Sequence, residues 1–108
     1  MTKAIAMSEI TISKPLHKVL THLTGEERID VALPLAAKDL LKLKLRENEQ
    51  LIKEFENRYK IGFEEFKASW EHDGLNDKYS YQVEKDYWEW EAAITDQKHF
   101  RSMLEELA

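Results

Sequence analysis

The chain has 108 residues, of which 34% are charged and 43% are hydrophobic. This is the size of one domain, which can build a modest core but not a deep enclosed pocket. There is no cysteine, which excludes disulfides, thiolate metal sites and a cysteine nucleophile. Three glycines and two prolines argue against an all-β or loop-rich chain.

The net charge of −5 is unevenly distributed along the chain. Residues 1–45 carry seven Lys or Arg against five Asp or Glu, a net +2, whereas residues 46–108 carry nine against sixteen, a net −7. An acidic C-terminal part is a poor surface for nucleic acid and suits a basic protein partner. A solvated acidic face explains the same composition equally well.

The N-terminus lacks the basic-then-apolar pattern of a signal peptide. No apolar run approaches the ~20 residues that a membrane helix needs. We therefore expect a cytoplasmic protein with no membrane segment.

Residues 8–13 alternate in the manner of a β-strand, with Ile10 and Ile12 on one side and Glu9, Thr11 and Ser13 on the other. One short strand is not stable alone, because its edges are unpaired. The pattern predicts pairing with the same strand of a second copy, through Ile10 and Ile12.

Two short helical patterns follow this strand. The first, through Leu16 and Leu23, ends at Thr24-Gly25, where glycine can adopt the left-handed conformation. The second starts near Glu26, and Pro34 either kinks it or begins the next helix afresh. A strand followed by two helices has the order of a ribbon-helix-helix half, in which a two-stranded ribbon enters the DNA major groove. Its candidate DNA-binding residues are Thr11, Ser13 and Lys14, and Glu9 opposes DNA binding.

The longest helical pattern covers Pro34–Tyr59. Its 4, 3, 4, 3, 4 spacing places an apolar stripe on one side of the helix. The stripe consists of Leu41, Leu45, Asn48, Ile52, Phe55 and Tyr59. Such a helix must bury its stripe on its own chain, a second copy or another protein. Asn48 either fixes register in a helix pair or meets water where the seam opens.

Residues 63–70 predict a short amphipathic helix. Residues 79–107 predict a last helix with a potential break near Thr95-Asp96. The expected fold is mainly α: one N-terminal strand paired across a dimer, two short helices, a long central helix and one or two C-terminal helices. We expect Leu35 and Leu41, at the start of the central helix, to join Ile10 and Ile12 in the dimer.

Aromatic and acidic residues are concentrated in residues 79–91, with more aromatics than a small core needs. Tyr87 and Trp90 share one side of a helix, and Trp88 must point about 100° away from Tyr87. Tyr and Trp are enriched as interface anchors. These aromatics therefore either pack on the stripe of the central helix or form a partner surface.

Patterns typical of enzymes are missing from the sequence. There is no glycine-rich phosphate loop and no Gly-x-Ser-x-Gly elbow. The four histidines have no spacing that brings two onto one helical face for a metal, and no Glu-x-x-His pair occurs. We expect no catalytic residue, no metal, no cofactor and no small-molecule substrate.

The segments YKIGFEEFKASW (Tyr59–Trp70) and SYQVEKDYWEWEAA (Ser80–Ala93) follow a strand, two helices and a long helix. This combination resembles the antitoxins of prokaryotic type II toxin–antitoxin pairs. The resemblance implies an N-terminal part that dimerises and often binds operator DNA. It also implies an acidic tail that covers a small basic toxin, commonly a ribonuclease.

The resulting expectation is a non-enzymatic antitoxin-like protein that neutralises a basic toxin and regulates its own transcription. Residues 1–45 would dimerise and contact DNA, and residues 46–108 would bind the toxin. The expected toxin-binding residues are Phe63, Phe66, Trp70, Tyr87, Trp88, Trp90, Glu84, Asp86, Glu89 and Glu91. The alternative is a self-contained helical homodimer or adaptor whose aromatics complete its own core.

Overall fold

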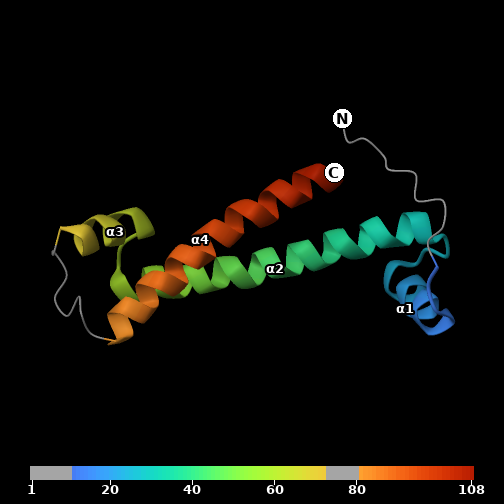
Figure 1. The fold of residues 1–108 in the computed structure, drawn as a ribbon, viewed down its shortest axis with the longest axis horizontal. Helices are drawn as coiled ribbons and strands as arrows, with labels where there is room; N and C mark the ends of the chain where they lie inside the picture. Colours follow the sequence, from blue (N-terminus) through green and yellow to red (C-terminus); the bar gives the residue numbers. More distant parts are fainter. Residues whose placement is uncertain (1–10, 73–80) are drawn as a thin grey trace.

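The computed structural model describes residues 11–72 and 81–108 (Figure 1). In these residues the chain forms four helices and no strand. The helices are α1 (Lys14–Thr24), α2 (Ile29–Tyr59), α3 (Phe63–Glu71) and α4 (Tyr81–Leu107). The expected mainly α class is confirmed.

The predicted N-terminal strand gains no support from the structure. Residues 8–10 lie outside the described residues, and Thr11, Ile12 and Ser13 carry no regular secondary structure. Ser13 is extended, but it serves as the N-cap of α1, where its hydroxyl accepts a hydrogen bond from the Leu16 N–H at 3.3 Å. Its backbone conformation is therefore explained by helix capping without a strand.

Glycine ends α1 as the sequence predicts. Gly25 has a φ of 75°, and its N–H donates to the Thr21 carbonyl at 2.8 Å. The Thr24 hydroxyl donates to the Leu20 carbonyl at 2.7 Å. A side chain with a Cβ is strained at this positive φ, so the turn between α1 and α2 favours glycine.

The two helices that the sequence separates at Pro34 are one continuous helix, α2. Pro34 is its sixth residue, so the missing N–H leaves only the Asp30 carbonyl without its helical donor. The 31 residues of α2 correspond to about 46 Å at ~1.5 Å per residue. This length accounts for most of the 57 Å long axis of the molecule. The helix also crosses residues 45 and 46, so the two predicted regions share one rigid element.

A tight corner separates α2 from α3. Lys60 adopts a φ of 61°, and its N–H donates to the Glu56 carbonyl at 2.8 Å. Gly62 is the N-cap of α3. The short connection folds α3 back over the end of α2, where it also contacts α4 (Figure 1).

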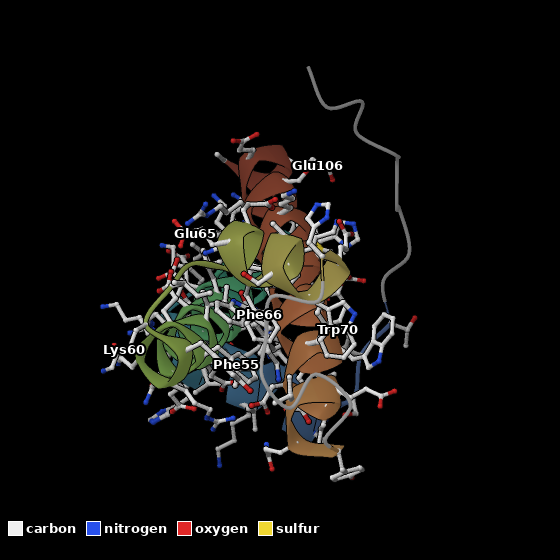
Figure 2. All side chains as sticks on the ribbon, turned by 90° about the vertical axis from the view of Figure 1, so that its left-hand side faces the viewer. Phe55, Lys60, Glu65, Phe66, Trp70 and Glu106 are labelled. Carbon is white, nitrogen blue, oxygen red and sulfur yellow. The ribbon has the colours of Figure 1, made fainter. Side chains whose placement is uncertain are left out.

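The main core lies where α2, α3 and α4 meet. α4 runs antiparallel to α2 and is uninterrupted, so the potential break near Thr95 does not occur (Figure 1). The buried cluster consists of Phe55, Phe63, Phe66, Tyr87 and Trp90. Figure 2 shows Phe55 and Phe66 directed between the helices, with Lys60 and Glu65 on the outside. The apolar stripe of the central helix is thus buried by its own chain over Asn48, Ile52 and Phe55.

The N-terminal end is built differently. α1 packs on the first turns of α2. Of the described residues up to 45, only Leu20 and Ala32 are buried. Leu16, Val19 and Leu23 stay exposed on α1. The N-terminal helix pair therefore has much less core than the other end.

Candidate protein-binding surface

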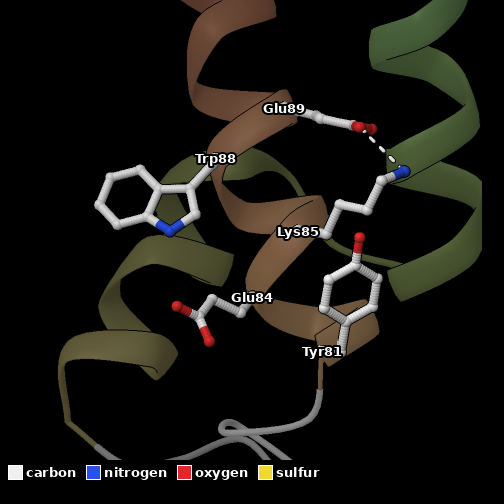
Figure 3. Close-up of a pocket in the computed structure, with 5 residues that line it drawn as sticks. All are labelled: Tyr81, Glu84, Lys85, Trp88 and Glu89. Carbon is white, nitrogen blue, oxygen red and sulfur yellow. Dashed lines mark ion pairs between the residues drawn. The ribbon is translucent and has the colours of Figure 1, made fainter.

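An aromatic and acidic surface lies at the start of α4. Its residues, the Trp88 surface, are Tyr81, Glu84, Lys85, Trp88 and Glu89, which line a hollow of about 350 Å³. The exposed fraction is 57% for Trp88 and 79% for Tyr81. Figure 3 shows Trp88 and Glu84 on one side of the helix and Lys85, Glu89 and Tyr81 on the other.

Helix geometry explains why Trp88 faces solvent. Its neighbours Tyr87 and Trp90 occupy the buried side of α4, and residue 88 is rotated about 100° from residue 87. The Trp88 ring meets the Tyr87 ring edge-on, with centroids 5.0 Å apart and an interplanar angle of 88°. The exposed indole is therefore supported at its edge by a buried ring.

Charge is arranged asymmetrically around this indole. Lys85 Nζ lies 2.9 Å from Glu89 Oε1, and both side chains are about half exposed. The hydrogen bond to Glu89 raises the pKa of Lys85. No ion pair is recorded for Glu84 within residues 11–72 and 81–108. The carboxylate on the Trp88 side of the helix is thus available to an incoming cation.

A buried polar cluster on the inner side of α4 anchors this surface to α2. Asp86 is 1% exposed and accepts three hydrogen bonds. Arg58 Nη1 donates at 2.6 Å, the Tyr59 hydroxyl donates at 2.6 Å, and Gln82 Nε2 donates at 2.8 Å. A buried carboxylate needs such partners, because an unpaired buried charge is strongly destabilising.

The cluster shifts the protonation of its members. Burial alone raises the pKa of Asp86, but the hydrogen bonds from Tyr59, Arg58 and Gln82 outweigh it, so this pKa lies below its ordinary value. Burial, assisted by the hydrogen bond to Asp86, raises the pKa of Tyr59 to about 12. The hydrogen bond to Asp86 raises the pKa of Arg58. At neutral pH the cluster is an ionised carboxylate held by a cation, a phenol and an amide.

The expected toxin-binding residues separate into four groups: the core, the polar cluster, half-buried side chains and exposed side chains. Phe63, Phe66, Tyr87 and Trp90 lie in the intramolecular core, and Asp86 lies in the polar cluster. Trp70 is half-buried and stacks on Tyr87, with ring centroids 4.8 Å apart. Trp88, Glu84 and Glu89 are exposed, and Glu91 is half-buried. As folded, the core aromatics support the surface and are not open to a partner.

The expected DNA and dimer residues that the structure describes lie apart from the Trp88 surface, around the start of α1 and along α2. Thr11, Ser13 and Lys14 are exposed, although Ser13 caps α1. Ile12 is half-buried, and Ile10 lies outside the described residues. Leu35 is 36% exposed, and Leu41 is half-buried. Of the described residues, Thr11, Ser13 and Lys14 are neighbours at the start of α1, whereas Leu35 and Leu41 lie on α2.

The polar cluster on Asp86 is missing from the sequence-based expectation, which placed Asp86 on a partner surface. One pattern could have revealed it. Asp86, Trp90 and Ala93 are spaced 4 and 3, which places the carboxylate on the buried side of α4. A charged residue on that side requires a partner, but Arg58 and Tyr59 are distant in sequence. Tyr81 and Lys85 were also not foreseen as part of the exposed surface.

Neither metal-binding nor membrane-spanning features occur in the described part of the chain. No group of three or more His, Cys, Asp or Glu side chains there is arranged to hold a metal ion. No helix in residues 11–72 or 81–108 is both long and apolar enough to cross a membrane. No family model matches the chain, and no curated protein or solved structure shows significant similarity to it.

Proposed function

We propose that the chain is a non-enzymatic, antitoxin-like protein that binds and neutralises a small basic protein toxin. The observation that carries the proposal is Trp88, an indole 57% exposed on α4, with Glu84 on the same side of the helix (Figure 3). An exposed tryptophan beside a carboxylate is typical of the residues that anchor protein interfaces. It suits a partner surface rich in Arg or Lys.

The chemistry of this surface fits a guanidinium or ammonium group. A cation can stack on the indole face and pair with the Glu84 carboxylate at the same time. The net −7 of residues 46–108 attracts a basic partner over distances comparable to the Debye length and raises its association rate. Because α4 is held on α2 by the Asp86 cluster, the surface is preorganised and little order is lost on binding.

A direct binding measurement tests this proposal. The probe is the protein encoded next to this gene, titrated into the full chain by calorimetry. We expect a complex at micromolar concentration or tighter, with Trp88→Ala weakening it at least ~30-fold, as for an interface hot spot. Met103→Ala is the control, because Met103 is 43% exposed on the same helix but outside the Trp88 surface. No complex with the wild-type chain, or equal affinity in Trp88→Ala, contradicts the proposal.

The proposal extends to autoregulation through the N-terminus. Thr11, Ser13 and Lys14 are exposed next to the basic start of α1 and are the proposed DNA contacts, with Ile10 and Ile12 pairing two copies. A gel shift with the chain's own promoter tests this extension. We expect binding that is weakened in Thr11→Ala/Lys14→Ala, since the latter removes a phosphate contact. Unchanged binding in that variant removes these residues as the DNA contacts.

A second candidate function is a self-contained helical homodimer or adaptor without a toxin. The observation in its favour is that Phe63, Phe66, Tyr87 and Trp90 complete an intramolecular core and need no partner. Tryptophan fluorescence separates the two functions, because Trp88 is exposed and Trp90 is fully buried. A blue shift of the Trp88 emission on addition of the neighbouring protein supports the toxin-binding function. An unchanged spectrum supports the adaptor.

A further inference from the structure

A polar side chain interrupts the buried stripe of α2. Asn48 is 8% exposed, and its Oδ1 atom has no hydrogen-bond partner in the described residues. A buried amide oxygen without a donor costs free energy, whereas a leucine side chain of similar shape fills such a position without that cost. Asn48 therefore brings a polar group to a place where packing alone favours an apolar one.

The Asn48 amide lies at a hollow of about 450 Å³ between α2 and α4. The two helices diverge toward the C-terminal end of α4, beside which the hollow lies (Figure 1). A half-turn of the amide about its Cβ–Cγ bond exchanges Oδ1 and Nδ2, so the amide can turn its acceptor to the hollow. We call this site the Asn48 hollow. It is lined by Lys44, Glu47, Asn48 and Leu51 of α2 and by Asp96 and Phe100 of α4.

Two carboxylates border the Asn48 hollow, one from each helix. Glu47 Oε2 lies 3.9 Å from Lys44 Nζ, and both side chains are more than half exposed, so this ion pair is loose. Asp96 is exposed and takes part in none of the ion pairs among residues 11–72 and 81–108. Two carboxylates against one ammonium leave the lining with a net charge of −1. The hollow therefore offers acceptors to a cation.

The lining fits a guanidinium better than other cations. A guanidinium carries five N–H donors in one plane and can reach several acceptors at once, whereas an ammonium is a compact point charge. Phe100 is half-buried and supplies a ring on which a guanidinium can stack. Leu51 is 37% exposed and can contact the apolar stem of an arginine. A metal ion fits less well, because Lys44 adds a positive charge to the lining.

We propose that the Asn48 hollow binds an arginine side chain of the basic partner. The guanidinium stacks on Phe100 and donates to the Asp96 carboxylate and to Asn48 Oδ1, which thereby gains its missing partner. Lys44 moves into water and frees Glu47 for the same cation. That the arginine belongs to the toxin rests on the proposed function, whereas the arginine site itself does not.

The Asn48 hollow is distinct from the Trp88 surface. Asp96 follows Trp88 by eight residues, which corresponds to ~12 Å along α4 and about 80° around its axis. An interface of ordinary size extends further than this separation, so one small protein can contact both places. The partner is then held at two points, by the exposed indole and by the buried amide.

NMR spectroscopy of the isotope-labelled full chain tests the site without the partner. The probe is Nα-acetyl-arginine amide, and Nα-acetyl-lysine amide at the same ionic strength is the comparison. We expect saturable shifts of the Asn48 side-chain amide signals, with half-saturation below about 50 mM, and smaller shifts with the lysine compound. Asp96→Asn should abolish the shifts. Glu105→Gln is the matched control, because it makes the same charge change at an exposed site about 180° around α4.

Calorimetry with the protein encoded next to this gene tests where the arginine comes from. We expect Asp96→Asn and Asn48→Leu each to weaken the complex at least ~10-fold, and Glu105→Gln to leave it unchanged. Asn48→Leu should also raise the melting temperature of the free chain by about 4 °C, because it removes the unpaired amide. A gain in stability together with a loss of affinity separates a binding role of Asn48 from a role in folding.

The outcomes distinguish this site from the Trp88 surface. No response of Asn48 to the arginine compound overturns the site, and equal responses to the arginine and lysine compounds overturn its preference for guanidinium. If Trp88→Ala weakens the complex but Asp96→Asn and Asn48→Leu do not, the Asn48 hollow is not a partner site and the proposed function stands. If the arginine compound binds at Asn48 but no complex forms, the arginine site stands and the proposed function is wrong.

Discussion

The two ends of α2 differ in how far the rest of the chain buries their apolar side chains. Near its C-terminal end, Phe55 stacks on Trp90 with ring centroids 5.4 Å apart, and both side chains are at most 2% exposed. In its N-terminal half, Leu40 and Leu43 are about half exposed. Both ends are helical and leucine- or aromatic-rich, so the difference does not come from helix formation. It comes from what the rest of the chain can place across each end.

Trp88 and Trp90 repeat this contrast on a single turn of α4. Trp90 is fully buried, whereas Trp88 is 57% exposed. One indole is therefore part of the core, and the other is a surface feature that a stability argument does not explain. Apolar residues that the fold leaves outside, at Trp88 and along α1, are the places where partners are expected.

The largest expected effect is the loss of the Trp90 ring. Trp90→Ala removes the side chain that contacts Phe55, Phe63 and Phe66, and we expect a loss of about 4 kcal/mol in the free energy of unfolding. Leu23→Ala, at a side chain 70% exposed, should cost less than about 0.5 kcal/mol in the monomer. Urea denaturation measures both free energies of unfolding, at protein concentrations low enough that the chain is monomeric. Equal losses would show that the two ends do not differ as described.

The next effect comes from the polar cluster. Asp86→Ala leaves Tyr59 and Gln82 without their acceptor, and we expect a loss of about 2–3 kcal/mol at neutral pH. The loss of the Arg58 pair adds little, because that side chain is 49% exposed and can be rehydrated.

The cluster also predicts a pH dependence. Because the pKa of Asp86 is lowered in the folded chain, its contribution is present above the unfolded value of about 3.9 and is lost as pH falls through the folded value. Between pH 7 and pH 2, the melting temperature of the wild type should therefore fall more steeply with decreasing pH than that of Asp86→Ala. The exposed Asp96→Ala is the control and should retain the wild-type slope.

A smaller effect is expected at alkaline pH. Tyr59→Phe removes the hydroxyl that donates to Asp86 and should cost about 1–2 kcal/mol at neutral pH. The pKa of Tyr59 is raised to about 12, so its contribution is complete below the unfolded value of about 10 and is lost as pH rises through about 12. Burial also raises the pKa of Tyr87, so tyrosinate absorbance should show more than one late-titrating tyrosine, of which the one near 12 is missing in Tyr59→Phe. If all tyrosines of the wild type titrate near their ordinary value, the hydrogen bond is not maintained.

The smallest effect concerns the N-terminal end. Pro34→Ala restores the helical donor for the Asp30 carbonyl, and we expect a gain of about 1 kcal/mol, less than the full interior penalty because the site is near the helix start. Thermal unfolding of the variant and of Ala37→Ser, an exposed control on the same helix, measures the difference. A destabilised Pro34→Ala would indicate that the proline ring contributes packing that outweighs the missing bond.

Local chemistry made much of the fold predictable. Gly25 and Gly62 mark helix boundaries in both the sequence and the structure, because each allows a backbone conformation or a cap that ends a helix. The spacing of Asn48, Ile52 and Phe55 identified the buried side of α2. The outward direction of Trp88 also followed from its rotation relative to Tyr87.

The errors came from features that depend on context. The strand predicted from the alternation in residues 8–13 gains no support in residues 11–13, where Ser13 caps α1. Pro34 is tolerated because it stands early in α2, a position that the sequence does not reveal until the helix start is known. The partners of Asp86 come from another helix, so no local pattern can name them.

The Asp86 cluster also determines how α4 is positioned along α2. Ring contacts tolerate sliding, since an aromatic side chain finds apolar neighbours at several positions along a helix. The carboxylate does not tolerate it, because moving α4 by one turn, about 5.4 Å, separates Asp86 from Arg58 and Tyr59 and leaves a buried charge unpaired. The cluster therefore fixes the position of α4 along the axis of α2. It thereby also fixes where along the molecule Trp88 is exposed to a partner.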